Sequence, residues 1–232
     1  MSRRTIAFCL LAVIAAAVFA RLGVWQLARL HEKVRRNTSI AAQQLQPSTQ
    51  LASVPRDTAG AHYRKAKVLG RFDYDQEVVL GGRSHQGSPG VDLLTPLRIA
   101  ASDTAILVDR GWVYSPDGAS VDGARWRERD TATITGYIEV YAPDADVTHS
   151  TRHPRMVRRV SRAELASRIP YPLAPYYIVA TGDSADGPHP ARRELPALDE
   201  GPHRSYAMQW FAFAAIALAG AGLVIARERR RG

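Results

Sequence analysis

Two uncharged apolar stretches, one near each end, constrain this 232-residue chain more than any other feature. They run from residue 6 to 20 and from residue 210 to 226. A transmembrane helix needs about 20 residues to cross the hydrocarbon core of a bilayer. Both stretches reach that length with their flanking residues, the first if Arg21 extends its guanidinium to the interface. We therefore expect a transmembrane helix at each end of the chain and a soluble part between them.

The expected domain boundaries follow from these two helices. A polar, helix-compatible stretch and then a loop follow the first helix, and a linker rich in Gly and Pro precedes the second. The expected parts are a transmembrane helix (1–25), a stalk and loop (26–60), a β-rich domain (61–180), a linker (181–202), a transmembrane helix (203–226) and a basic tail (227–232).

A cleavable signal peptide is the alternative explanation for the first apolar stretch. Its basic start, its apolar run and the ending Val18-Phe19-Ala20 have the form of such a peptide. In either case the residues that follow are exported, so the central domain is expected outside the cytoplasm.

The charges beside the two stretches predict the orientation. Four arginines follow the second stretch within residues 227–231, which places the C-terminus in the cytoplasm. Basic residues after the first stretch outnumber those before it and favour the opposite orientation, but long loops are translocated largely regardless of charge. We expect a multi-pass protein of the plasma (inner) membrane with both termini in the cytoplasm.

Cysteine and charge exclude several classes of protein. The only cysteine, Cys9, lies in the first apolar stretch, so no disulfide, C-x-x-C-H haem attachment or thiol-based copper carriage is expected. The net charge is +9. A cytoplasmic protein of this charge would suggest nucleic acid, but an exported domain rarely meets it. We expect no nucleic-acid partner, and expect membrane lipid or acidic protein surfaces instead.

The pattern of residues in the middle of the chain predicts mostly short strands. Residues 131–141 give the clearest one, because Ile134 and Ile138 lie at period 2 with other small or apolar residues. Short strands separated by Gly, Pro and Asp turns predict an antiparallel barrel or sandwich. The expected fold class is an α+β membrane protein whose two terminal helices flank a mainly antiparallel, barrel-like β domain. The other expected strands are 64–72, 76–80, 91–99, 105–108 and 176–180.

One short helix should interrupt the strands. Ser161 and Glu164 have the spacing of a capping box, in which each side chain accepts from a free backbone N–H group of the other residue. The helix should run through Arg168 and stop before Pro170.

Catalytic motifs are missing from the sequence. It contains no G-x-S-x-G, H-E-x-x-H, Walker A or G-x-G-x-x-G pattern. The Gly-rich residues 81–90 are better explained as a hairpin loop than as a phosphate cradle. A membrane-anchored hydrolase is therefore disfavoured, and we expect a protein that is not an enzyme.

The start of the second helix carries the candidate site. His203, Tyr206, Ala207 and Trp210 are spaced i, i+3, i+4, i+7, so they share a helix face. Trp25, at the outer end of the first helix, should lie at the same depth. A histidine among aromatic rings at a membrane surface can place its imidazole on the iron of a flat, apolar macrocycle.

Two features of a helix N-terminus support the interpretation of His203 as an iron ligand. The helix dipole disfavours a charged imidazolium at His203, and Arg204 with the free N–H groups can contact acidic propionates. An ordinary interfacial belt of His, Tyr and Trp explains the same residues without any ligand.

Four blocks of the sequence resemble the Surfeit locus 1 family, whose members assist the assembly of haem–copper cytochrome c oxidase. The blocks occur in the family's order and spacing, with departures at Asp109, where Asn is usual, and at Pro202. They are Leu22-Gly-Val-Trp-Gln26 with Arg29 and Lys33; Gly70-Arg-Phe72 with Glu77, Leu80-Gly-Gly-Arg83, Gly87, Gly90 and Thr95-Pro96; Leu107-Val-Asp-Arg-Gly-Trp-Val113; and His203-x-x-Tyr206-Ala-x-Gln209-Trp-Phe211.

The resemblance implies a retained first helix and a function. It implies a factor that delivers or stabilises haem a during the biogenesis of oxidase subunit I, with subunit I and haem a synthase as partners. His203, with Trp210 beside it, matches the family's proposed haem position, so His203 is the expected ligand of the haem iron. The alternative is a membrane-anchored scaffold that binds oxidase subunits and never binds haem; Trp25, His203 and Trp210 would then be interface residues.

Overall fold

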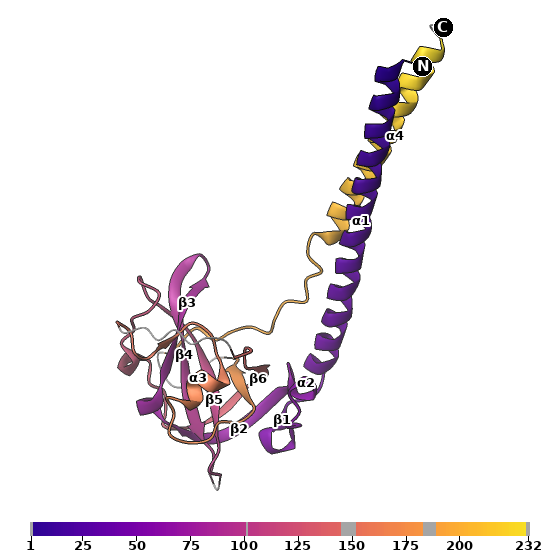
Figure 1. Cartoon of the computed structure of the whole chain (residues 1–232). Helices are drawn as coiled ribbons and strands as arrows, with labels where there is room; N and C mark the ends of the chain where they lie inside the picture. Colours follow the sequence, from indigo (N-terminus) through magenta and orange to yellow (C-terminus); the bar gives the residue numbers. More distant parts are fainter. Residues whose placement is uncertain (1, 101, 145–151, 183–188, 231–232) are drawn as a thin grey trace. The chain divides into compact units, whose positions relative to one another are not determined.

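The computed structural model describes residues 2–100, 102–144, 152–182 and 189–230 (Figure 1). The chain divides into two units. A helical unit is formed by residues 1–41 and 197–232, and a β domain by residues 42–196. Each unit is described separately below.

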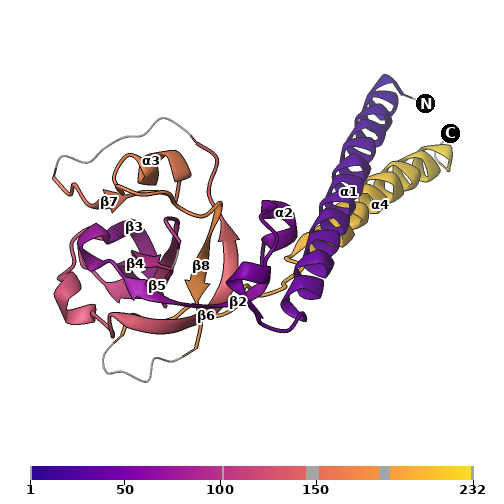
Figure 2. The ribbon, with the colours of Figure 1, turned by 90° about the horizontal axis from the view of Figure 1, so that it is seen from below.

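Two long helices form the helical unit. Helix α1 spans Arg3–Gln44 and helix α4 spans His203–Arg229, and they lie side by side in both views (Figures 1 and 2). Both are long and apolar enough to cross a membrane, as the two apolar stretches predict. Helix α1 continues well beyond its apolar part, so the polar stretch that follows Trp25 is helical up to Gln44.

Most of the buried residues of the two helices are small. The buried positions of α4 are Ala207, Ala214 and Ala221, which recur every seven residues on one face. Ala16 and Gly23 are buried on α1 at the same spacing. Small side chains allow two helices to pack by van der Waals contact where the hydrophobic effect does not drive them together. The large apolar side chains point outward instead; among the most exposed are Leu10, Leu11, Ile14, Val24, Ile216 and Leu223.

Eight strands in the described part of the β domain form one sheet. Its order is β1-β2-β6-β8-β5-β4-β3-β7. The strands are β1 (Thr49–Gln50), β2 (Lys65–Phe72), β3 (Val78–His85), β4 (Ser88–Arg98), β5 (Ala105–Tyr114), β6 (Thr131–Val140), β7 (Met156–Val157) and β8 (Tyr176–Ala180). Two short α-helices accompany them, α2 (Thr58–Ala61) and α3 (Arg162–Ala166), with 3-10 turns at Leu51–Ser53, Tyr74–Gln76 and Gly123–Trp126.

The predicted barrel-like closure is wrong, because the sheet is not a closed barrel. Strands β2 and β4 pair only at Arg71 with Arg98 and Phe72 with Leu97, while β1 and β7 remain as edges. Most pairs are antiparallel as expected, but β1–β2, β3–β7 and β5–β8 are parallel. Alternating polarity in one strand reports which face is buried and not which strand lies beside it.

The sheet buries apolar side chains on both faces. Ile134 and Ile138 of β6 are buried in one cluster with Val68, Ile106 and Ile178, which confirms the predicted parity of this strand. A second cluster includes Leu80, Leu94, Leu107 and Val179, and Leu165 of α3 packs into it. A sheet covered on both sides has strands with few polar positions, as in the fully buried β8.

Local turn and cap predictions are confirmed with two differences. The hairpin predicted within residues 81–90 is the β3–β4 turn, in which Gln86 and Gly87 both have positive φ. Strand β3 nevertheless continues through the glycines at 81 and 82, with a shift in register there. The Ser161 hydroxyl accepts from the Glu164 N–H group as the capping box requires.

Helix α3 differs from its prediction at its other end. The Glu164 carboxylate accepts a hydrogen bond from Arg168 at 3.1 Å, an i, i+4 pair on the helix surface. The helix ends at Ala166, before the predicted Arg168.

A buried charge network crosses the sheet. Arg110 of β5 is fully buried. It donates to Glu77 at 2.6 Å, to Glu128 at 3.0 Å and to the Thr95 hydroxyl at 2.8 Å. Because a buried charge without partners is very costly, this arginine depends on all of these acceptors.

The chain after β8 is tied to the same network. Ala191, within the predicted linker, exchanges two backbone hydrogen bonds with Trp112 of β5. Arg192 contacts Glu128, and Arg193 contacts Asp92 and, at 3.5 Å, Asp109. The pKa of Asp109 is raised to about 7, mainly by burial and then by the neighbouring Asp92 carboxylate, against the effect of the Arg193 guanidinium.

Candidate functional site

His203 lies in the first turn of α4 and is half-buried. Its Nδ1 atom is 2.9 Å from the Oε1 atom of Gln26 on α1. An amide oxygen only accepts hydrogen bonds, so in this orientation of the Gln26 amide the Nδ1–H group donates to it. In a neutral imidazole this leaves the lone pair of Nε2 available. The sequence places this histidine at a helix start, and the fold gives it a partner on the other helix.

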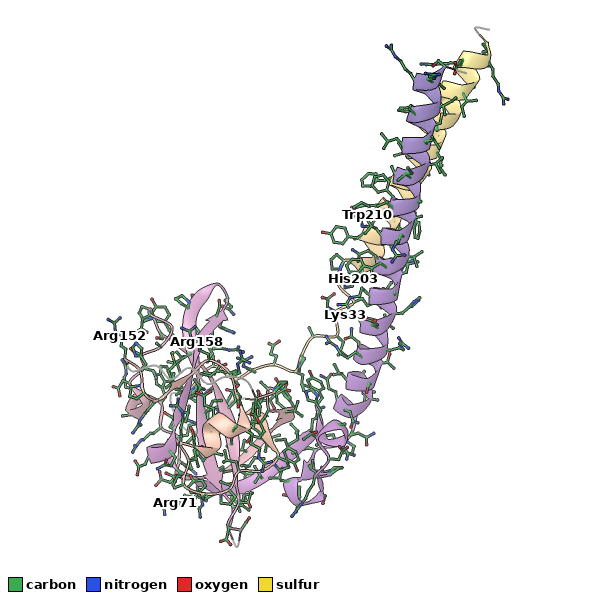
Figure 3. The ribbon with its side chains drawn as sticks, viewed as in Figure 1. Lys33, Arg71, Arg152, Arg158, His203 and Trp210 are labelled. Atoms are coloured by element: carbon green, nitrogen blue, oxygen red, sulfur yellow. The ribbon has the colours of Figure 1, made fainter. Side chains whose placement is uncertain are left out.

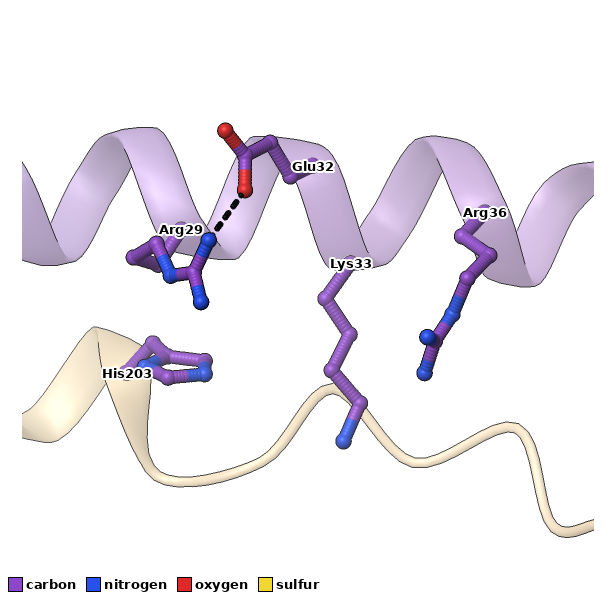
Figure 4. Close-up of a pocket in the computed structure, with 5 residues that line it drawn as sticks. All are labelled: Arg29, Glu32, Lys33, Arg36 and His203. Carbon is purple, nitrogen blue, oxygen red and sulfur yellow. Dashed lines mark hydrogen bonds and ion pairs between the residues drawn. The ribbon is translucent and has the colours of Figure 1, made fainter. Parts of the chain in front are cut away.

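A cavity of about 290 Å³, lined mainly by charged side chains, opens beside His203. The remaining lining residues all come from α1, and Figure 4 shows them along the helix opposite the imidazole. They are Arg29, Glu32, Lys33 and Arg36. Three cationic groups and one carboxylate make the cavity electropositive, so it suits an acidic group.

Ion pairs engage only part of this positive charge. Arg29 donates to Glu32 at 2.8 Å, and the ammonium group of Lys33 is 3.8 Å from the Asp199 carboxylate, which is mostly exposed. Within the described residues, Arg36 has no ion pair. Asn37 donates to the Asp199 carbonyl at 3.0 Å, which holds the approach to α4 against α1. The cavity therefore keeps cationic groups that an incoming anion can contact.

Trp210 lies two helical turns after His203 (Figure 3). Its ring stacks on Phe19 of α1 with centroids 5.7 Å apart, and meets Phe213 edge-on at 5.9 Å. Trp210 thus belongs to an aromatic cluster between the two helices and is half-buried there.

The other predicted site residues lie outside the cavity lining. Trp25 is 53% exposed, Tyr206 is 46% exposed, and Arg204 is also exposed. Among the described residues, no ring contact involves Trp25 or Tyr206. The structure brings His203 together with α1 and leaves these three side chains on the surface.

The sequence reasoning missed the cationic lining of the cavity. It assigned the acidic group to Arg204 and to the helix N-terminus, whereas the cavity is lined by Arg29, Lys33 and Arg36. Their spacing of i, i+4, i+7 places them on one helix face, and that signal was available in the sequence. The role of Gln26 had no such signal, because its partner is far away in the chain.

A second cavity, of about 390 Å³, belongs to the β domain. Its charges largely offset each other, because three arginines and three aspartates line it and Arg71 is 3.9 Å from Asp130. In the described part of the chain, no group of three His, Cys, Asp or Glu side chains could hold a metal ion. The cavity at His203 is thus the better candidate for a ligand site.

Comparison with known proteins agrees with the four sequence blocks. The model of the SURF1 family matches residues 13–215. A SURF1-like protein of Rickettsia conorii is 28% identical over 213 residues, which cover 88% of this chain and 85% of that protein. SURF1-like proteins of Monosiga brevicollis and Drosophila melanogaster are 25% and 26% identical, covering 85% and 88% of this chain and 80% and 73% of their own lengths.

Proposed function

We propose that this chain, which belongs to the SURF1 family, is a membrane-anchored assembly factor that holds haem a for cytochrome c oxidase subunit I. The SURF1 family is generally linked to the assembly of cytochrome oxidase and is a family of assembly factors rather than enzymes. The observation that carries the haem proposal is a histidine with a free Nε2 beside an electropositive cavity.

The proposed location is the plasma (inner) membrane. Both α1 and α4 would span it, which explains the outward-facing leucines, isoleucines and valines of both helices. The arginines after residue 226 favour a cytoplasmic C-terminus. A second span in the opposite direction returns the N-terminus to the same side and leaves the β domain outside the cytoplasm.

The residues around His203 fit the donor set that a haem requires. Haem supplies an iron atom that takes an axial imidazole, and an acidic edge that needs cationic partners. His203 would hold the iron through Nε2, and Arg29, Lys33 and Arg36 would contact the propionates. The cavity is smaller than the ~300–1,000 Å³ of pockets that enclose whole ligands. It would therefore hold the polar edge, while the apolar helix surfaces and lipid cover the rest.

Each side chain then has a separate task. His203 would hold the iron, the three cations on α1 would contact the acidic edge, and Trp210 keeps the two helices in contact through Phe19. An open, partly exposed site favours release to a partner over permanent retention. Subunit I is the proposed recipient, with haem a synthase as the proposed donor.

A scaffold without haem is the second candidate, favoured by the exposed aromatic residues. Trp25 and Tyr206 lie outside the cavity and are about half exposed, and such residues often anchor protein interfaces. In this case the cavity cations would contact acidic side chains of an oxidase subunit.

The visible spectrum of the protein decides between the two candidates. Protein purified in detergent from cells that make haem a should carry haem absorbance. His203→Ala should lose most of the haem and shift the remaining absorbance, since the axial ligand sets the electronic state of the iron. His31→Ala is the matched control, because His31 is an exposed histidine of α1 outside the cavity. Equal haem content and equal spectra in all three proteins would reject haem binding through His203, and the absence of haem from all three would support the scaffold.

A further inference from the structure

We propose that Gln26 is a positioning residue that fixes the tautomer and the ring orientation of His203. The inference rests on the proposed function where it concerns haem, but its central claim concerns the imidazole alone. The observation is the hydrogen bond of 2.9 Å between Gln26 Oε1 and His203 Nδ1, which joins α1 to α4.

The chemical consequence follows from the two nitrogens of imidazole. A neutral histidine in solution exchanges its hydrogen between Nδ1 and Nε2, and only the nitrogen without hydrogen coordinates a metal. An acceptor placed at Nδ1 holds the hydrogen there and leaves the Nε2 lone pair free. Partners of this kind orient histidine ligands, and their loss typically weakens metal affinity by about 10- to 100-fold.

The position of Gln26 makes this orientation depend on helix pairing. Gly23, Gln26, Lys33 and Asn37 lie on one face of α1, at offsets of 3, 10 and 14 residues from Gly23. On one side of Gln26, Gly23 lies against the Phe211 ring of α4. On the other side, Lys33 and Asn37 both contact Asp199. The amide is therefore held between two points of contact that lie on either side of it along α1. A free α4 would present His203 with no fixed tautomer.

An amide also suits this cavity better than a carboxylate. The cavity already contains Glu32, which engages Arg29. A second carboxylate at position 26 would accept from Nδ1 equally well but would add negative charge beside an acidic ligand, which costs free energy. Gln26 orients the imidazole and leaves the net positive charge unchanged.

The test measures the tautomer directly in protein without haem. Protein labelled with ¹⁵N-histidine is studied in detergent micelles by NMR, and the His203 signals are identified by their loss in His203→Ala. The wild-type chain should show hydrogen on Nδ1 only. Gln26→Leu should show both tautomers, while Gln26→Glu should keep the wild-type tautomer. Gln43→Leu, the same substitution elsewhere on α1, should change nothing.

Haem titration of the same variants separates this inference from the proposed function. Gln26→Leu should weaken haem binding by about 10- to 100-fold, and Gln26→Glu should shift the absorbance without removing the ligand. If Gln26→Leu keeps a pure Nδ1–H tautomer, the positioning role is wrong, even where His203→Ala still loses haem. If the tautomer changes in Gln26→Leu but no variant alters haem binding, the positioning role stands and the haem proposal fails.

Discussion

In the helical unit all buried residues except Ile40 are alanine or glycine, whereas the β domain buries leucine, isoleucine, tyrosine and even arginine. The large apolar residues of α1 and α4 face outward, and those of the sheet face inward in two clusters. The outward-facing side chains of the helices are compatible with a surrounding lipid phase, while the apolar side chains of the sheet pack against one another. The two units thus bury different kinds of residue, and the candidate site lies in the helical unit.

The largest expected effect of a single change is in the core of the β domain. Ile134→Asp places a carboxylate among Val68, Ile106 and Ile178. Burying an unpaired charge should cost several kcal/mol, a large part of the about 5–15 kcal/mol that stabilises a domain. Hydrogen exchange measured by mass spectrometry should show a deprotected sheet and unchanged apolar parts of α1 and α4.

Thr133→Asp is the matched control for this change. Thr133 precedes Ile134 on β6 and is exposed, so the same carboxylate should alter stability by less than about 0.5 kcal/mol. If both variants lose protection from hydrogen exchange in the sheet to the same extent, the alternation of residues along β6 does not determine which of them are buried.

A smaller effect is expected from Asp109, whose pKa is raised from 3.8 to about 7. The folded protein binds this proton more tightly than the unfolded chain does. The free energy of unfolding should therefore fall as pH rises from about 4 to about 7, and level off above that. Asp109→Asn retains the oxygen that accepts from the Gly111 N–H group and removes the titration. It should raise stability at pH 8 by about 1–4 kcal/mol, at about 1.4 kcal/mol per pKa unit.

Denaturant unfolding of the β domain across this pH range measures the effect. Asp103→Asn removes an exposed carboxylate and should keep the wild-type pH dependence. Two results would show that Asp109 ionises without a cost in stability. One is a wild-type free energy of unfolding that rises between pH 4 and pH 7, and the other is an Asp109→Asn variant whose stability depends on pH as the wild type's does.

The smallest effect is expected in the helical unit, at Gly23. A Cβ atom there would lie 2.7 Å from the ring of Phe211. Because that ring is partly exposed and can move, Gly23→Val should weaken the pairing of α1 and α4 by only about 1 kcal/mol. Faster hydrogen exchange in the first turns of α4, with an unchanged sheet, is the expected result.

Gly220 provides the control for this substitution. A Cβ atom at Gly220 meets nothing within 4 Å, so Gly220→Val adds the same side chain without a clash. If both variants exchange at the wild-type rate, close approach at Gly23 does not hold the helices together. If the sheet loosens as well, the two units are more strongly coupled than their separate packing implies.

Local periodicity explains why much of the fold could be predicted. Two long apolar stretches define α1 and α4, and alternation at Ile134 and Ile138 defines the buried face of β6, because each pattern lies within one segment of backbone. The Ser161 cap and the β3–β4 turn are likewise set by neighbouring residues. For the same reason the position of His203 at the start of a helix was predicted correctly.

Only the tertiary structure decided which segments meet. The strand order, the parallel pairs and the limited β2–β4 contact depend on pairings between distant residues, which no local pattern encodes. Arginine side chains are usually exposed, and nothing near Arg110 in the sequence predicts its burial. The fold brings its acceptors Glu77, Thr95 and Glu128 to it from distant segments. The site follows the same rule: the sequence supplied a histidine, and the pairing of α1 with α4 supplied Gln26 and the cations that decide what the imidazole can bind.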